Sequence, residues 1–214
     1  SADPVSAYFK VKTENIGYGK ITKQDEESGV KLSGAKYGIY TDSACTNKVD
    51  TISTGSDGTA TSKALVAGTY YVKEITAPKG YVLSGKVHTL TVKAGQTTGI
   101  KATDKEQLGN ITIYKEGEVL VGWNGSNYTY ETRKLPGATF KVTAGADIYK
   151  ADGTKVYSKG DVIAENLVSG SDGQVVLSDL HLGTYVVTET KSIDGYTINT
   201  TPQTVKIEYK DQNV

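Results

Sequence analysis

The sequence contains a single cysteine, Cys45, so no disulfide can form within the chain. Its only two histidines, His88 and His181, fall in different halves of the chain, so a shared metal site is not expected. A catalytic Cys45 would need one of these histidines as its base, and a small buried or half-buried thiol is the better interpretation. We therefore expect neither a metal nor a cofactor.

The chain also lacks an excess of charge of either sign and any long hydrophobic run. Its 24 basic and 24 acidic residues give a formal net charge of zero, whereas domains that bind nucleic acid or anionic membranes are usually basic. No apolar stretch is long enough to span a bilayer, and we expect no signal peptide within these residues. We expect no nucleic acid as a partner and no membrane contact by this segment.

The residues that are abundant favour an all-β fold. The chain has 24 glycines and 15 tyrosines, is rich in threonine and valine, and has only four prolines and no methionine. Such a composition is typical of short strands joined by glycine turns. A length of 214 residues suits two modest domains better than one.

One stretch of the sequence occurs twice, as a strand followed by a turn, at residues 68–81 and 183–196. In both copies apolar and polar residues alternate, so that a glutamate, Glu74 or Glu189, shares a face with tyrosine and valine. If that face is the core, an ionised carboxylate is costly there. Each glutamate should therefore be paired, hydrogen-bonded or protonated.

Other segments repeat in the same order, which predicts two domains of one fold. The matching pairs are residues 17–23 with 109–115, 32–37 with 135–140, and 54–58 with 169–173. We predict domain one at 16–106 and domain two at 107–214, with residues 1–15 as the last strand or linker of a preceding domain. About seven short strands in each domain favour a β-sandwich. Domain two carries extra residues before Leu135 and before Ser171, which we expect to form loops or an extra hairpin.

The repeat brings a lysine and a glutamate to apolar faces in each domain. Lys23 and Lys115 lie on the first strands, and Asp104 lies on the last strand of domain one, in step with Ile100. Burial favours the uncharged forms of amines and carboxyl groups. A neutral amine beside a carboxyl or carboxamide carbon is a nucleophile beside an electrophile, and a protonated glutamate can shuttle protons between them. The product would be an amide crosslink between two side chains.

These motifs resemble the CnaB-type (SpaA-type) domains of Gram-positive surface adhesins and pilins. The resemblance covers about residues 16–214 and is carried by Lys23 in Ile-Thr-Lys-Gln-Asp, by Lys115, and by the repeated segments that begin at Leu32, Leu135, Gly68 and Gly183. It implies two tandem inverse immunoglobulin-like β-sandwich domains with self-formed isopeptide bonds. By position, the bond of domain one would join Lys23 to Asp104, assisted by Glu74. Asparagine is the usual acceptor in this family, so Asp104 is a departure, and its condensation would release water instead of ammonia.

Domain two is expected to lack its last strand in this chain. Asp104 follows Glu74 by 30 positions, and the same spacing from Glu189 leads to position 219, beyond Val214. Lys115 should then have no proper partner, unless a shorter loop allows Asn213 to serve.

The N-terminal segment shows the complementary pattern. Residues 11–15, Val-Lys-Thr-Glu-Asn, match residues 100–104, Ile-Lys-Ala-Thr-Asp, and this places Asn15 at the position of an acceptor. The simpler interpretation is that Asn15 belongs to a preceding domain. The alternative is strand exchange, in which residues 8–15 of one molecule complete domain two of another.

Two functions follow from these expectations. The first is structural: an extracellular stalk or shaft segment of a cell-wall-anchored adhesin or pilin, whose partners are the neighbouring domains of the same surface protein. The second is a binding module that recognises a host matrix protein or glycan through the insertions of domain two, with Trp123 as the candidate contact residue. An enzyme with turnover is the weakest interpretation, because the lysine–glutamate chemistry acts once and on the chain itself.

Overall fold

The computed structural model describes residues 3–9 and 15–214, and its regular elements are all strands. No helix with the length and apolarity needed to cross a bilayer occurs in these residues. The described chain divides into two compact units. The first ends at residue 104 and the second contains residues 79–82 and 105–214. We call them domain one and domain two.

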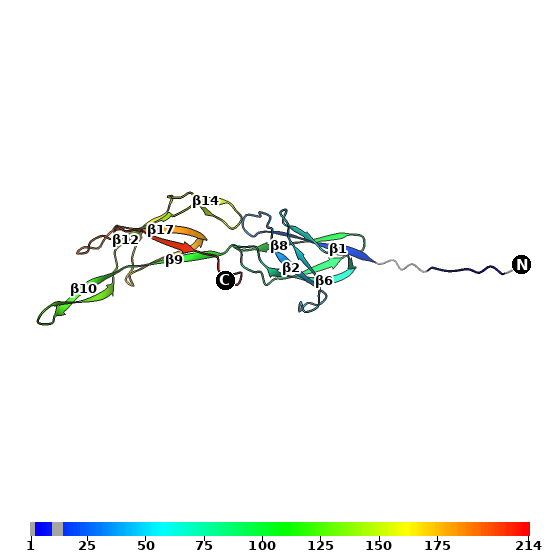
Figure 1. Ribbon diagram of the computed structural model, residues 1–214, viewed down its shortest axis with the longest axis horizontal. Helices are drawn as coiled ribbons and strands as arrows, with labels where there is room; N and C mark the ends of the chain where they lie inside the picture. Colours follow the sequence, from blue (N-terminus) through cyan, green and yellow to red (C-terminus); the bar gives the residue numbers. More distant parts are fainter. Residues whose placement is uncertain (1–2, 10–14) are drawn as a thin grey trace. The chain divides into compact units, whose positions relative to one another are not determined.

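Domain one contains eight strands that form two sheets. One sheet has β1 at its centre, with β4 and β5 on one side and β8 on the other, and the second sheet has the order β3-β2-β6-β7. The strands are β1 (Ile16–Asp25), β2 (Lys36–Tyr40), β3 (Lys48–Ser53), β4 (Thr59–Thr61), β5 (Leu65–Val66), β6 (Gly68–Thr76), β7 (Val87–Val92) and β8 (Thr97–Asp104) (Figure 1). The predicted all-β sandwich is confirmed.

The first and last strands of domain one run parallel along almost their whole length. Their register begins with Tyr18 beside Thr97 and ends with Asp25 beside Asp104. Because side chains alternate across a strand, Lys23 and Asp104 both point to the inner face of the sheet, close to the ends of their strands. This register brings together two residues from opposite ends of the domain sequence.

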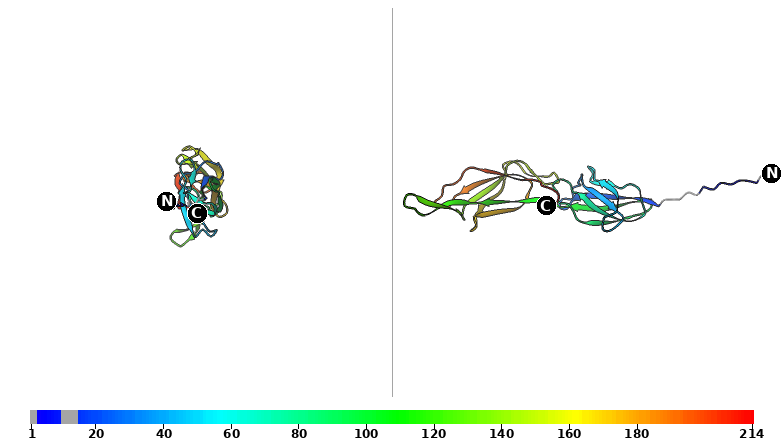
Figure 2. Two further views of the ribbon diagram at one scale, coloured as in Figure 1. Left: turned by 90° about the vertical axis from the view of Figure 1, so that its right-hand side faces the viewer. Right: turned by 60° about the horizontal axis from the view of Figure 1, so that its bottom comes forward.

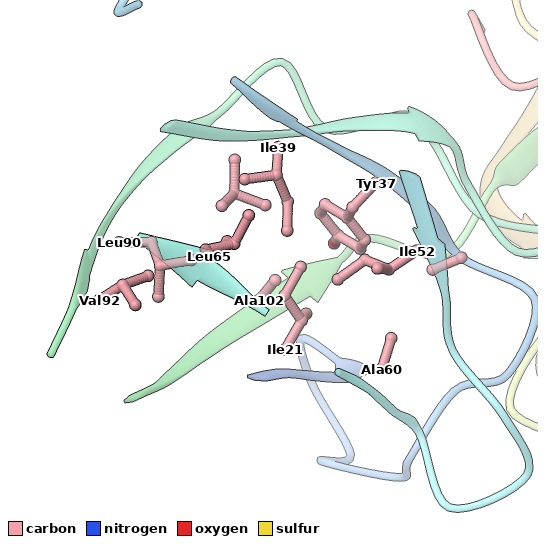
Figure 3. Close-up of a cluster of buried hydrophobic side chains, with 11 residues drawn as sticks. Ile21, Tyr37, Ile39, Ile52, Ala60, Leu65, Leu90, Val92 and Ala102 are labelled. Carbon is pink, nitrogen blue, oxygen red and sulfur yellow. The ribbon is translucent and has the colours of Figure 1, made fainter. Parts of the chain in front are cut away.

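The core of domain one lies between the two sheets. Figure 3 shows Ile21 and Ala102 from the first sheet facing Ile39 and Tyr37 from the second. The buried faces follow the period of two that the sequence predicts, and Lys23 continues the row that contains Ile21. An amino group therefore ends up at the edge of an apolar core.

Domain two contains ten strands. They are β9 (Leu108–Tyr114), β10 (Glu116–Trp123), β11 (Tyr128–Lys134), β12 (Thr139–Ala144), β13 (Ile148–Tyr149), β14 (Lys155–Tyr157), β15 (Val162–Val168), β16 (Gln174–His181), β17 (Gly183–Lys191) and β18 (Gln203–Ile207). One sheet has the order β15-β12-β17-β18, which corresponds to β3-β2-β6-β7 of domain one. The other contains β9 and β16.

Domain two differs from domain one at the edge of its first strand. β18 pairs with β17 as β7 pairs with β6, so β18 is the counterpart of β7 and not of β8. In the described part of domain two, β9 pairs with β16 alone, and no strand takes the position of β8. This agrees with the strand count expected from the repeat.

The two insertions of domain two form hairpins, one of the two forms predicted for them. β10 and β11 pair with each other and extend away from the sheets of domain two, as both Figure 1 and Figure 2 show. The second insertion supplies the short pair β13 and β14. The first hairpin enlarges the tight turn that follows Lys23 in domain one.

Of residues 8–15, which were expected to act as a strand, Tyr8, Phe9 and Asn15 lie outside the strands, and residues 10–14 lie outside the described residues.

Candidate functional site

A buried lysine is the centre of the site in domain one. Lys23 has no exposed surface, and its amine lies between strands β1, β2, β6 and β8. Its Nζ atom is 3.0 Å from Oε1 of Glu74 and 2.5 Å from Oδ1 of Asp104. Both carboxyl groups are buried as well. The structure thus brings together the three residues that the sequence singled out in domain one.

Glu74 is a buried carboxyl group with a raised pKa. Burial raises its pKa from 4.5 to about 7, against the opposing effects of the Ser84 amide and of Lys23. The amide of Ser84 donates a hydrogen bond to Oε2 at 3.0 Å and fixes the carboxyl group. At neutral pH this carboxyl group exists in both forms, so it can both give and take a proton.

Asp104 presents its carboxyl group to the lysine with no competing contact. No hydrogen bond from the described residues reaches either of its side-chain oxygens, and the ion pair with Lys23 is the polar contact it makes. The contact with Lys23 Nζ therefore places this carboxyl group beside the amine.

Tyr37 is a member of the site that the sequence reasoning missed. Lys23 Nζ donates a hydrogen bond to its hydroxyl oxygen at 2.7 Å. Burial, and then the nearby charge of Glu74, raise the pKa of this hydroxyl above its ordinary value, so it remains protonated. The sequence did contain a signal for this residue. Tyr37 lies on the inward face of a repeated segment, and Phe140 occupies the same position in domain two.

A glycine turn holds the backbone of each lysine. The amide of Lys23 donates to the carbonyl of Gly58 at 2.7 Å, and Lys115 donates to Gly173 at the same distance. Gly58 has a φ of +73°, and a Cβ atom there would lie 2.8 Å from the carbonyl oxygen of Lys23. Glycine is needed at this position both for the backbone conformation and for the close approach.

Domain two repeats two of the three groups. Lys115 Nζ lies 3.3 Å from both carboxylate oxygens of Glu189, and the amide of Asn199 donates to Glu189 Oε2 at 3.0 Å, as Ser84 does to Glu74. The side chain of Lys115 remains 15% exposed, whereas Lys23 is fully buried. Phe140 replaces Tyr37, so the hydroxyl is missing. Among the described residues, Glu189 is the one acidic side chain that pairs with Lys115.

Comparison with known families agrees with this arrangement. The family model described as "SpaA: Prealbumin-like fold domain" matches residues 17–106 and 128–214. The chain belongs to the SpaA family. The two matches correspond to the two domains, and the gap between them, residues 107–127, contains β9 and β10, whereas β11 lies within the second match. Domain one has no counterpart of the β10–β11 hairpin.

The relatives are surface proteins and pilins of Gram-positive bacteria. The chain is 28% identical over 188 residues to the trypsin-resistant surface T6 protein of Streptococcus pyogenes serotype M6, covering 82% of the chain and 34% of that protein. The structure of the Bacillus anthracis TIE protein matches 92% of the chain with 26% identity and a TM-score of 0.65, covering 32% of that protein. A streptococcal ancillary pilin matches with 21% identity and a TM-score of 0.40, covering 92% of the chain and 60% of the pilin. The chain spans about a third of the length of the first two relatives. Its SpaA domains are of the type found in pilins and surface-protein stalks.

The remaining candidate residues lie away from the lysines of the two SpaA domains. Asn213 lies near the start of β9, because its amide bonds to Asp211, whose carbonyl accepts a hydrogen bond from Gln107. Lys115 follows the other end of β9, so the structure does not bring Asn213 to it. Asn15 directly precedes β1, where its carbonyl accepts a hydrogen bond from Ala67.

Trp123 lies at the end of the β10–β11 hairpin and is exposed. Its ring packs edge-on against Tyr128 with the centroids 5.0 Å apart.

Proposed function

We propose that this chain is a structural stalk or shaft segment of a cell-wall-anchored adhesin or pilin, exposed at the bacterial surface. We further propose that domain one crosslinks itself through an amide bond between Lys23 and Asp104. The observation that carries the proposal is the contact of 2.5 Å between Lys23 Nζ and Asp104 Oδ1, with both side chains fully buried.

In the reaction, Glu74 carries protons and remains unchanged. The amine of Lys23, in its neutral form, attacks the side-chain carbonyl carbon of Asp104 and a C–N bond forms. Protonated Glu74 donates to an oxygen of Asp104, one C–O bond breaks, and the oxygen leaves as water with protons that came from the amine. An ammonium and a carboxylate thereby become a neutral amide and one water. The reaction also removes a buried charge pair, which is otherwise costly.

Intact mass spectrometry under denaturing and reducing conditions tests the crosslink. The wild-type chain should be lighter than its sequence by one water. Lys23→Ala and Lys23→Arg should have the mass of their sequences, whereas Lys115→Ala should keep the loss. An unshifted wild-type mass, or a loss of water that persists in both Lys23 variants, would contradict the proposal.

In domain two, the described residues supply two of the three groups that the proposed crosslink needs. Lys115 and Glu189 correspond to the nucleophile and the proton shuttle, while the acceptor has no counterpart among the described residues. We propose that Asn15 is the acceptor residue for a preceding domain. Exchange of residues 8–15 between molecules remains the alternative, and sedimentation distinguishes the two because exchange makes the mass depend on protein concentration.

A second candidate function rests on the aromatic face of the β10–β11 hairpin. Leu120 pairs with Tyr130 and Trp123 pairs with Tyr128, and all four side chains are exposed. Directly opposed residues share one face of a hairpin, so these form one apolar surface. Such a surface is suited to contact with a host matrix protein or a glycan.

Binding measurements with immobilised matrix proteins and a glycan array test this second function. Trp123→Ala should abolish binding without changing the melting temperature, because the side chain is 58% exposed. Val162→Ala, also exposed but outside the hairpin, is the control. If the wild-type chain bound nothing, or if Trp123→Ala bound as well as the wild type, the second function would be rejected. The structural role would then be the one function proposed.

A further inference from the structure

The turn at the end of the β10–β11 hairpin is closed by a side chain. Oδ1 of Asn124 accepts hydrogen bonds from the backbone amides of Ser126 at 3.0 Å and of Asn127 at 2.8 Å. The amide of Asn124 donates in turn to the carbonyl of Asn127 at 3.0 Å. Asparagine side chains commonly close turns in this way. The carboxamide group of Asn124 is therefore folded back along the backbone that follows it.

The residue after Asn124 leaves this carboxamide group accessible. Asn124 is the one asparagine of the sequence that precedes a glycine. Both residues are exposed, and a Cβ atom at Gly125 would meet nothing within 4 Å. Among the described residues, the amide of Gly125 has no hydrogen-bond acceptor. Its nitrogen is thus unshielded and stands next in the chain to a side-chain carbonyl carbon.

The two hydrogen bonds to Oδ1 make that carbon a better electrophile. A nucleophile that attacks a carbonyl group places negative charge on its oxygen, and donors already aimed at the oxygen stabilise this charge. The amides of Ser126 and Asn127 are such donors. At Asn199, by comparison, the amide of Thr201 is the one donor to Oδ1 among the described residues, at 3.0 Å. The next residue there is Thr200, whose branched side chain crowds its own amide nitrogen.

We propose that Asn124 is a site of spontaneous modification, at which the amide nitrogen of Gly125 attacks the side chain and converts the asparagine into aspartate and isoaspartate. The nucleophile and the electrophile belong to adjacent residues, so the reaction closes a five-membered ring and needs no enzyme. The site is separate from the lysines of both domains. It does not depend on the crosslink proposed for domain one.

The reaction consumes one water and releases one ammonia. The nitrogen of Gly125 loses its proton to a solvent base and bonds to Cγ of Asn124. The C–N bond of the carboxamide then breaks, and its nitrogen takes a proton from water and leaves as ammonia. The resulting succinimide adds water at one of its two carbonyl carbons. Opening on one side restores the backbone and leaves an aspartate, whereas opening on the other side leads the backbone through the side chain and leaves an isoaspartate.

Both products change the end of the hairpin. An aspartate adds a negative charge next to the exposed ring of Trp123, and an isoaspartate inserts one extra carbon into the backbone of the turn. The ring of Trp123 packs edge-on against Tyr128 on the other side of that turn, with the centroids 5.0 Å apart. A longer turn should separate the two rings. The modification would thus alter the aromatic face of the hairpin as the molecule ages.

Incubation of the full folded chain in mildly alkaline buffer tests the proposal. Samples taken over several weeks are digested, and the segment between Lys115 and Lys134 is analysed by fragmentation mass spectrometry. Asn124 should exchange its NH2 group for OH, and part of the product should accept a methyl group from an isoaspartyl methyltransferase. Asn127 and Asn199 are controls within the same molecule. Both should react more slowly by about tenfold or more, since bulkier residues follow them.

Two variants separate this route from other losses of ammonia. Gly125→Ala places a methyl group beside the nucleophile and should slow the exchange at Asn124 by about tenfold or more. Because Gly125 has a φ of +95°, alanine also strains the turn. Asn124→Gln is therefore the second variant. It leaves Gly125 in place, and its longer side chain would have to close a six-membered ring, so residue 124 should remain unmodified.

The fluorescence of Trp123 measures the structural consequence, because the chain has one tryptophan. Its emission should change in the wild type with the same time course as the exchange at Asn124. In Asn124→Gln the emission should stay constant over the same period.

The proposal would be overturned if Asn124 kept its amide group as long as Asn127 and Asn199 keep theirs. A product that contained aspartate without isoaspartate would also overturn it, because direct hydrolysis of the side chain yields aspartate alone. Complete exchange with an unchanged emission of Trp123 would overturn the effect on the aromatic face.

Discussion

A single hydroxyl group distinguishes the lysine environments of the two domains. In domain one, Tyr37 accepts a hydrogen bond from Lys23 Nζ, whereas in domain two Phe140 offers no acceptor. A hydrogen bond to a charged group contributes about 1.5–3 kcal/mol. The hydroxyl therefore helps to hold the amine beside Asp104, and its absence fits the greater exposure of Lys115.

We predict that Tyr37→Phe slows formation of the crosslink without abolishing it, because Glu74 and Asp104 remain in place while the amine is less firmly held. The measurement is the fraction of chains that have lost one water at successive times after a pulse of cell-free synthesis. Phe140→Tyr is the control and should leave the rate in domain one unchanged. Equal rates for Tyr37→Phe and the wild type would show that the hydroxyl has no positioning role.

The raised pKa of Glu74 predicts that the stability of domain one depends on pH. Burial raises its pKa in the folded chain to about 7 from 4.5, so the folded state binds more protons than the unfolded state between these values. Stability must then fall as the pH rises through this interval. In Lys23→Ala, which cannot form the crosslink, loss of the nearby cation raises the pKa further, so the effect should persist.

Urea unfolding of Lys23→Ala at about pH 5 and about pH 8 measures this effect, with lower stability expected at the higher pH. The double variant Lys23→Ala/Glu74→Gln should lose most of the difference, because glutamine does not titrate. If both proteins showed the same pH dependence, another group would be responsible for it.

At the scale of the strands, the glycine turns fix the backbones that carry the lysines. Gly58 and Gly29 both have a φ of +73°, but a Cβ atom at Gly29 would meet nothing within 4 Å, whereas at Gly58 it would collide with the backbone of Lys23. Alanine substitutions at Gly29 and Gly58 therefore separate two contributions to the loss of stability: the left-handed backbone conformation, which both share, and the steric clash, which occurs at Gly58.

We predict that Gly29→Ala costs about 1–2 kcal/mol, the penalty for a left-handed conformation, and leaves the crosslink complete. Gly58→Ala should cost more and should leave part of the protein without the loss of water, because the backbone of Lys23 must shift. Calorimetry and intact mass measure the two effects. Equal melting temperatures for the two variants would contradict the role assigned to the turn.

Much of this arrangement could be predicted from the sequence because the chain repeats itself. The period of two placed Ile21, Lys23 and Glu74 on buried faces, and the repeat predicted two β-sandwich domains with insertions in the second. Long, alternating strands are the case in which local pattern and tertiary burial agree. The spacing from Glu189 also indicated that no counterpart of β8 would be found.

Contacts between distant segments were harder to predict. The hydroxyl of Tyr37 meets Lys23 across two sheets, and the Gly58 turn reaches the backbone of Lys23 from another strand. Neither partner follows from alternation, because a strand pattern shows which face a residue takes and not which residue it faces. The partial exposure of Lys115 depends in turn on the neighbours of β9, which pairs with β16 alone in the described part of domain two.

At the scale of the whole chain, the two domains should differ in stability. The bond between Lys23 and Asp104 closes a loop of about 80 residues, which in the chain-entropy treatment of crosslinks contributes about 4–5 kcal/mol. A change of 1 kcal/mol shifts the melting temperature of a domain of this size by about 4–8 °C. Domain one should therefore melt well above domain two.

Calorimetry of Glu74→Gln tests this prediction, because glutamine has the same shape, keeps Lys23 and Asp104, and cannot carry the proton. We expect two transitions in the wild type, and in the variant a fall of the upper one by at least 15 °C, in line with about 4 kcal/mol. Glu189→Gln is the matched control and should leave the upper transition in place. An upper transition that is unchanged in Glu74→Gln would show that the crosslink adds little stability.

The parallel pairing of the first and last strands of domain one has a further consequence. Lys23 and Asp104 come from opposite ends of the domain sequence and meet only when β1 and β8 lie side by side, so the bond can form only in a chain that has already reached this arrangement. Once formed, it survives when the fold is lost. The loss of one water therefore remains in the mass of each molecule after unfolding. The mass of a chain dissolved in denaturant still shows whether its first domain was ever folded.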